Sequence, residues 1–158
     1  MTCVVAIAND TKVFVGFDST ASSNETYILS ATPKAQIIGN HIVGFAGSWA
    51  TGQRAIAMLS AYSMDLKRFL KDFDSDEEDW QLLIASAGEI LEVTADRSVV
   101  SVMFREGVGY NAIGSGSDVA LGSLHGDHRN GRRSVERALE ASAAHALSVR
   151  PPFAILSL

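Results

Sequence analysis

Thr2 is the residue whose position offers chemistry. It follows Met1 and leads directly into an apolar run over residues 3–8. If Met1 is removed, Thr2 becomes the N-terminus, and one residue then carries both a hydroxyl nucleophile and a free α-amine. An adjacent amine is an effective base for a weak alcohol nucleophile. The pattern therefore suggests an enzyme that attacks its substrate with its own first residue.

Short apolar runs separated by turn residues predict the strands that must position Thr2. Residues 3–8 and 12–17 flank an Asn-Asp turn and predict a β-hairpin. Both runs are apolar at nearly every position, which indicates strands covered on both faces. Asp18 ends the second strand. Residues 19–25 predict a loop, residues 27–31 a short strand, and residues 35–38 and 41–47 a second hairpin.

Helices and further strands follow. Ser48 can cap a helix over residues 49–63, and residues 64–73 predict a shorter one. The acidic run 74–79 predicts an exposed loop, because it lacks the ligand spacing of a calcium site. A third hairpin, residues 81–87 and 89–94, is continued as a meander by residues 98–104 and 110–114. Helices are predicted over residues 118–124 and 133–148, the second stopped by Pro151-Pro152, and a last strand over 153–157.

The composition favours one globular domain over residues 1–158. Of the 158 residues, 47% are hydrophobic and 20% charged, and the net charge is -5. Strands flanked by helices on both sides predict an α+β fold. The sequence lacks a basic patch with interleaved aromatics, which argues against nucleic-acid binding. No apolar run approaches the ~20 residues of a membrane span.

Cysteine usage and the N-terminus favour a cytoplasmic location without cofactors. Cys3 is the single cysteine, which fits a reducing compartment, and no signal peptide is recognisable. The glycines around Gly114 are not followed by the Lys-Ser or Lys-Thr pair of a phosphate loop. His125 and His128 are better explained by a polar loop between two helices than by a metal site.

Four short motifs occur in order along the chain: residues 2–7, the Gly-Phe-Asp-Ser turn at 16–19, the glycine turn at 44–48 and the glycine-serine turn at 112–117. Together they resemble the proteasome β-subunit and HslV peptidase group of the N-terminal nucleophile (Ntn) hydrolases. The chain also resembles small proteasome-like proteins of bacteria and their phages, which begin Met-Thr-Cys and end in a Pro-Phe strand. The resemblance covers nearly the whole chain and implies a four-layer αββα sandwich with two facing sheets.

The same resemblance implies a threonine-type peptidase or amide hydrolase. Thr2 Oγ would be the nucleophile, and the Thr2 α-amine the base, directly or through a water. Lys34 is the implied cation and Asp18 its partner; Thr2 and Asp18 are 16 residues apart, as are Asp18 and Lys34. A nearby cation would lower the pKa of the amine below its usual value of about 7.7–8.0. Gly47 would present a backbone N–H to the oxyanion, and Ser115 would hydrogen-bond the Thr2 end of the site.

Substrate and partners follow from the resemblance in the same way. We expect a peptide or protein substrate, with Ser22, Phe45 and Trp49 lining its pocket. We expect a homo-oligomer, as a ring or stacked rings, with an ATPase unfoldase as a further partner.

Two alternatives stay open at this point. The first is a catalytically inactive subunit that uses the fold for a structural or interaction role. The family carries an aspartate in its last long helix, whereas alignment places Ala144 or His145 there, with Ser148 as the candidate serine that follows. A retained Met1 would also acylate the Thr2 nitrogen and remove the base. The second alternative is an amide hydrolase of the same superfamily that acts on small molecules.

Overall fold

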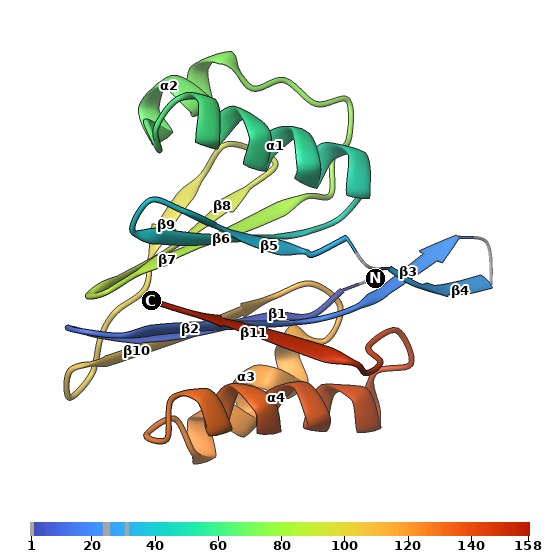
Figure 1. The fold of residues 1–158 in the computed structure, drawn as a ribbon, viewed down its shortest axis with the longest axis vertical. Helices are drawn as coiled ribbons and strands as arrows, with labels where there is room; N and C mark the ends of the chain where they lie inside the picture. Colours follow the sequence, from blue (N-terminus) through green and yellow to red (C-terminus); the bar gives the residue numbers. More distant parts are fainter. Residues whose placement is uncertain (1, 24–25, 31) are drawn as a thin grey trace.

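Two facing β-sheets lie between two layers of helices in the computed structural model, which describes residues 2–23, 26–30 and 32–158, without the side chains of residues 22–27 (Figure 1). The four-stranded sheet has the order β10 (Val108–Ile113), β1 (Val4–Asn9), β2 (Val13–Asp18), β11 (Phe153–Ser157). The five-stranded sheet has the order β5 (Ala35–Ile38), β6 (His41–Ala46), β7 (Gln81–Ser86), β8 (Glu89–Thr94), β9 (Val99–Ser101). Neighbouring strands in both sheets are antiparallel.

The helices cover the outer faces of the two sheets. The helices α1 (Trp49–Ala61) and α2 (Leu66–Asp72) cover the five-stranded sheet, and α3 (Ser117–Gly126) and α4 (Arg132–His145) cover the four-stranded sheet (Figure 1). The α+β fold predicted from the sequence and the αββα sandwich implied by the resemblance are therefore confirmed. Ser48 caps α1 as predicted, because its side chain accepts a hydrogen bond from the Thr51 N–H. Among the described residues, no helix combines the length and apolar character that crossing a bilayer requires.

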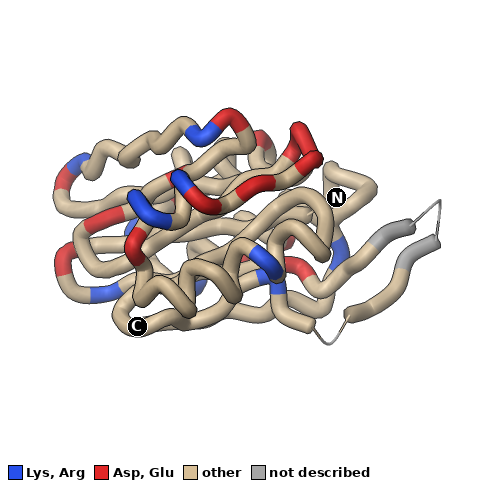
Figure 2. Tube along the Cα trace, turned by 90° about the horizontal axis from the view of Figure 1, so that it is seen from above, with Lys and Arg blue, Asp and Glu red and all other residues tan. Residues whose placement is uncertain are grey.

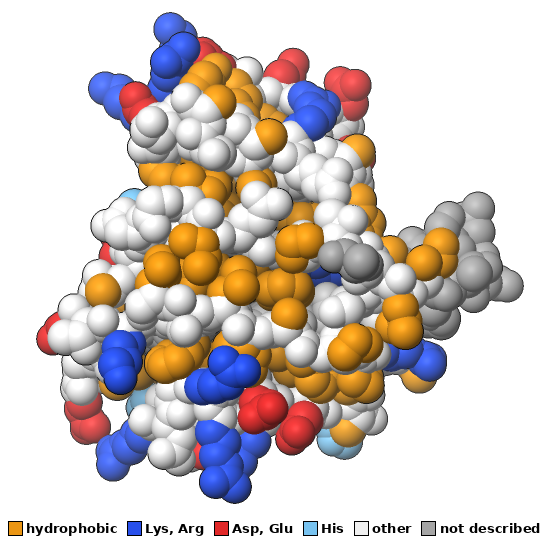
Figure 3. Space-filling view, viewed as in Figure 1, with side chains coloured by type: hydrophobic (Ala, Val, Ile, Leu, Met, Phe, Trp, Pro, Cys, Tyr) orange, Lys and Arg blue, Asp and Glu red, His pale blue; other side chains and the backbone are white. Residues whose placement is uncertain are grey.

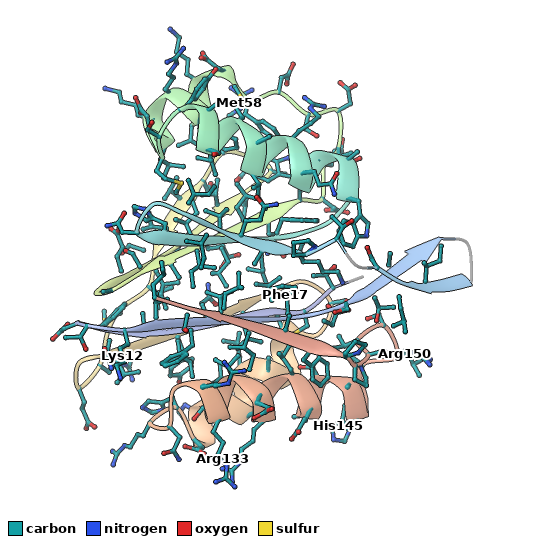
Figure 4. All side chains as sticks on the ribbon, viewed as in Figure 1. Lys12, Phe17, Met58, Arg133, His145 and Arg150 are labelled. Carbon is teal, nitrogen blue, oxygen red and sulfur yellow. The ribbon has the colours of Figure 1, made fainter. Side chains whose placement is uncertain are left out.

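Strand β1 is buried on both faces, as its continuous apolar run predicts. Val4, Ala6 and Ala8 contribute to the core between the sheets. The alternate residues Val5 and Ile7 contribute to the core under α3 and α4. A third core lies between the five-stranded sheet and α1 and α2. Figure 4 shows Phe17 between the two sheets, Met58 in one outer helix layer, and Arg133 and His145 in the other.

A close approach of α4 to β2 depends on Gly16. A Cβ at this position would collide with Val135, and it would lie 2.9 Å from Leu139 Cδ1. A residue without a side chain therefore lets the helix pack directly on the strand. This packing fixes the sheet in which β1, and with it Thr2, is held.

Three sequence predictions differ from the structure. Residues 19–25 were expected to form a loop, but β3 (Thr20–Ser23) pairs with β4 (Thr26–Leu29) in a two-stranded ribbon. The expected meander ends at β9, because β10 crosses to the other sheet and pairs with β1 along its whole length. The last long helix ends at His145 rather than Ser148, since the backbone is already extended at Ala146.

Candidate active site

Thr2 lies two residues before the first residue of β1 and is held by the turn between β10 and α3. Its side chain and backbone are 3% exposed. The Thr2 N–H donates a hydrogen bond to Ser115 Oγ at 3.2 Å, and Ser115 Oγ donates to the Thr2 carbonyl at 3.3 Å. The Gly116 N–H donates to the same carbonyl at 3.4 Å. The predicted link between Ser115 and Thr2 is therefore present.

Asp18 and Lys34 form a buried ion pair beside this position. Lys34 Nζ lies 2.9 Å from both Asp18 carboxylate oxygens, and the two side chains are 1% and 0% exposed. Asp18 Oδ1 also accepts the Cys3 N–H at 2.9 Å, and Oδ2 accepts the Thr20 N–H at 3.2 Å. The ammonium of Lys34 is thus connected through one carboxylate to the peptide group that joins Thr2 to Cys3.

Burial lowers the pKa of Lys34. Removing the ammonium from water lowers the pKa of Lys34, whereas the Asp18 carboxylate opposes the shift. The thiol of Cys3, on the other face of β1, is also buried, and this burial raises its pKa to about 11. Cys3 is therefore a neutral core residue at physiological pH.

Two glycines shape the backbone around Thr2. Gly114 has φ +89°, and a Cβ there would collide with the Thr2 carbonyl oxygen. Gly47 has φ +113°, and a Cβ there would lie 2.6 Å from the Asp79 carbonyl oxygen. Both positions require glycine, since the backbone is left-handed and the neighbouring backbone is close. The two turns meet beside Thr2 and border the same pocket.

A pocket of about 730 Å³ opens at Thr2. Its lining combines small residues, one tryptophan and three carboxylates: Thr2, Ala46, Gly47, Glu78, Asp79, Trp80, Gln81, Thr94, Ala95, Asp96, Gly114 and Ser115. Three of the predicted site residues, Thr2, Gly47 and Ser115, therefore share one cavity. Asp18 and Lys34 lie in the interior, where Asp18 accepts hydrogen bonds from both the Cys3 N–H and Lys34 Nζ.

Of the residues expected to bind substrate, Phe45 and Trp49 lie outside the lining of the pocket. Phe45 is buried under α1, where its ring makes an edge contact with Trp49. The alternation along β6 directs Phe45 to the outer face of the sheet, and neither aromatic residue is among the described residues that line the pocket. Ser22 lies in β3, and its side chain is outside the described part of the structure.

Two further polar residues contribute to the site, of which sequence reasoning named one as a candidate and missed the other. Ser148, considered only as a candidate, follows α4 and lies 2.8 Å from Ser115, Oγ to Oγ. Gln81 Oε1 accepts the Gly114 N–H at 3.1 Å, and Gln81 Nε2 donates to Glu92 at 3.0 Å. The only sequence signal for Gln81 is a polar residue at the start of an otherwise apolar strand.

The histidines are placed apart from this site. His125 belongs to the end of α3 rather than to a loop, and its Nδ1 lies 3.5 Å from the Tyr110 hydroxyl. The ring of His128 lies beside that of Tyr110, with 5.1 Å between the ring centroids and a tilt of 31°. Within the described ranges, no group of three or more metal-binding side chains comes together.

Comparisons with known proteins give the class of fold. No protein-family model and no curated protein sequence matches the chain. Solved structures match the chain over nearly its whole length. They have the HslV-like and proteasome-like Ntn-hydrolase fold, and the chain shares that fold. The sequence resemblance is therefore confirmed at the level of the fold.

The particular structures come from two organisms. Eukaryotic HslV from Trypanosoma brucei matches with a TM-score of 0.80 and 19% identity, covering 99% of this chain and 98% of the other. Thiobacillus denitrificans BPH in complex with epoxomicin matches with a TM-score of 0.79 and 19% identity, covering 99% and 97%. A second structure of Thiobacillus denitrificans BPH matches with a TM-score of 0.76 and 20% identity, covering 99% of this chain and 97% of the other.

Proposed function

We propose that the chain is a threonine-type peptidase or amide hydrolase whose nucleophile is Thr2 after removal of Met1. The observation that carries the proposal is the place of Thr2, at the wall of a pocket and one carboxylate away from a buried lysine. Met1 itself lies outside the described residues. The fold shared with HslV and BPH supports the same reaction class.

The reaction runs in two halves. Thr2 Oγ attacks the carbonyl carbon of the substrate amide while its proton passes to the Thr2 α-amine, directly or through a water. The tetrahedral intermediate collapses, the amine returns the proton to the leaving nitrogen, and an ester of Thr2 remains. A water then attacks this ester with the α-amine as base, which releases the acid and regenerates the hydroxyl.

The remaining residues act on charge and orientation. The Lys34 ammonium, held by Asp18, lowers the pKa of the Thr2 amine and so increases the fraction of free base near neutral pH. The Gly47 N–H stabilises the oxyanion, because glycine allows the substrate to approach the backbone closely. Ser115 orients the Thr2 nitrogen and is itself supported by Ser148.

The proposal includes a homo-oligomer. Strands β5 and β11 are edge strands of the two sheets and lie side by side, next to the base of the β3–β4 ribbon (Figure 1). Exposed apolar side chains occur on and beside these strands: Ile28 (57%), Leu29 (67%), Ile37 (47%) and Leu158 (43%). Figure 3 shows that lysine and arginine side chains on this face lie mainly over the helix layers, whereas the band between them is richer in apolar side chains. A second copy of the chain would cover this band.

An ATPase partner remains an expectation from the resemblance.

The chemical state of the N-terminus tests the proposal. Intact-mass analysis should give a chain that begins at Thr2. Epoxomicin, the compound bound in one BPH structure, or another electrophilic peptide should then add once per chain, at Thr2. The Thr2→Ala variant should lose labelling and peptide turnover, whereas Thr2→Ser should retain part of both. Thr11→Ala, in the exposed β1–β2 turn, is the matched control.

Complete retention of Met1 with no labelling at Thr2 would exclude this function. It would favour the alternative of a subunit that uses the fold without catalysis. Labelling combined with turnover of small amides alone would favour an amide hydrolase of small molecules.

A further inference from the structure

The pocket beside Thr2 is lined by carboxylates from two separate segments. Glu78 and Asp79 come from the loop between α2 and β7, and Asp96 comes from the turn between β8 and β9. No lysine or arginine is among the described residues that line the same pocket. Figure 2 shows several acidic segments on the side of the molecule near the N-terminus. The cavity therefore presents negative charge to a ligand that approaches Thr2.

These charges are available to a ligand. Of the described lysines and arginines, none forms an ion pair with Glu78, Asp79 or Asp96. The nearby Arg97 reaches Asp74 and the Phe73 carbonyl instead. Hydrogen bonds from Thr94 and Ser98 hold the Asp96 carboxylate in place and lower the pKa of Asp96, so that it stays ionised.

Asp79 adjoins the proposed reaction centre through its backbone and is also one of the residues that line the pocket. Its backbone carbonyl packs against Gly47, the proposed oxyanion residue, closely enough to exclude a Cβ there. The next residue, Trp80, is 5% exposed and lines the pocket together with Ala46 and Ala95. Long cationic side chains suit such a site, because their methylene stems cover apolar surface while the charged end reaches the carboxylates.

We propose that this pocket selects peptide substrates with a lysine or arginine side chain next to the bond that Thr2 attacks. The proposal rests on the proposed function for the bond cleaved, but binding of the cationic side chain can be measured without cleavage. The contribution of each carboxylate should be moderate, about two- to fivefold, because the three side chains are exposed to solvent. Salt should reduce it further.

The test uses three fluorescent peptides that differ at one position, which is lysine, norleucine or glutamate. Binding is measured by fluorescence polarisation with the Thr2→Ala variant, and cleavage with the natural chain. The lysine peptide should bind and be cleaved best, and its advantage over norleucine should shrink between low and high salt. The Glu78→Gln/Asp79→Asn variant should lose most of this advantage.

A matched control lies on the same loop. Asp76 and Glu77 are exposed and are not among the described residues that line the pocket, so Asp76→Asn/Glu77→Gln changes the same net charge outside it. This control variant should keep the preference for lysine.

Each outcome separates the two proposals. Equal binding of the lysine and norleucine peptides, no binding of any peptide, or an equal loss in the control variant would overturn the inference. A clear lysine preference in binding, without Thr2-dependent cleavage, would support it and refute the proposed catalysis alone.

Discussion

Asp18 is the residue on which the interior of the site depends. Its two oxygens accept hydrogen bonds from Cys3, Thr20 and Lys34, which belong to three different segments. Burying an ion pair gives little net stability, but removing one partner leaves an uncompensated buried charge. The pair therefore fixes the geometry around Thr2 more than it stabilises the fold.

Replacing Lys34 by Met should destabilise the chain by about 3–5 kcal/mol, because the Asp18 carboxylate would stay buried without a cation. The Lys34→Met/Asp18→Asn variant should recover part of this loss, since neither residue would then be charged. Denaturant unfolding measures both. Equal destabilisation of the two variants would show that the hydrogen bonds of Asp18, rather than its charge, dominate.

Cys3 should resist alkylation in the native chain at pH 8. The residue is fully buried, and with a pKa of about 11 only about one thiol in a thousand is ionised at this pH. Iodoacetamide labelling followed by mass spectrometry should therefore be slow until denaturant is added. Rapid labelling without denaturant would contradict the packing of β1 against α4.

The same thiol makes stability depend on pH. The native thiol stays protonated up to about pH 11, whereas the unfolded thiol ionises near 8.5. The unfolded state therefore binds fewer protons between these values, and the contribution of Cys3 to stability decreases as pH rises through this window.

At the scale of elements, a polar chain connects the two sheets next to the site. Gly114, at the end of β10, is held by Gln81 of β7. Gln81 in turn bonds Glu92 of β8, and Glu92 accepts from Asn111 of β10 at 2.8 Å. This chain sets the position of the turn that carries Ser115.

Replacing Gln81 by Leu should weaken the site more than the fold. The Gly114 N–H would lose its acceptor, which costs about 1–3 kcal/mol if the group stays buried. Displacement of the turn that carries Ser115 should slow the labelling of Thr2 by an electrophile. Each 1 kcal/mol that this displacement adds to the activation barrier lowers the rate by about fivefold. Gln53→Leu, on the exposed face of α1, is the control and should change neither rate nor stability.

Gly16 and Gly122 offer a paired test of helix packing. Gly16→Ala should destabilise the chain by about 1–3 kcal/mol, because the new methyl group overlaps Val135 and Leu139 of α4. Gly122→Ala, inside α3 with no atom within 4 Å, should stabilise by up to about 1 kcal/mol through helix propensity. Thermal unfolding distinguishes the two, and equal effects would contradict the close approach of α4 to β2.

The sequence predicted those elements whose signals are local. The β1–β2 hairpin followed from two apolar runs around a turn, and the α1 start followed from Ser48. The partner of β10 could not be predicted, because the apolar pattern of residues 110–114 suits either sheet. Ser148 could be named only as a candidate for a related reason: its contact with Ser115 depends on the helix ending at His145, three residues earlier than the pattern suggested.

For the site as well, contacts with a local sequence signal were predicted and those that depend on the fold were not. The Asp18–Lys34 pair and the Ser115–Thr2 contact were expected from motifs and are present. The lining of the pocket was not expected, because its walls combine an acidic loop and a β-turn with three further segments that only the fold brings together. The aromatic residues chosen for it, Phe45 and Trp49, instead pack under and along α1.

At the scale of the whole molecule, the proposed oligomer can be tested at the β3–β4 ribbon. Light scattering should give a mass of several chains, and Leu29→Asp should reduce it, because a carboxylate would be buried against the next copy. Leu147→Asp, at an 85% exposed leucine beyond α4, should leave the mass unchanged. A monomeric natural chain, or equal effects of the two variants, would contradict the interface.

The pairing of β1 with β10 also sets an order of events during synthesis. Thr2 precedes its partner Ser115 by 113 residues, so the ribosome must add this length before the turn that holds Thr2 exists. At about 5–20 residues per second this takes roughly 6–23 s. Once it has left the ribosome, the start of the growing chain is open to an aminopeptidase for the rest of that interval, whereas in the folded chain Thr2 is 3% exposed. Trimming of the first residue therefore competes with completion of the four-stranded sheet, and slower translation should favour the trimmed form.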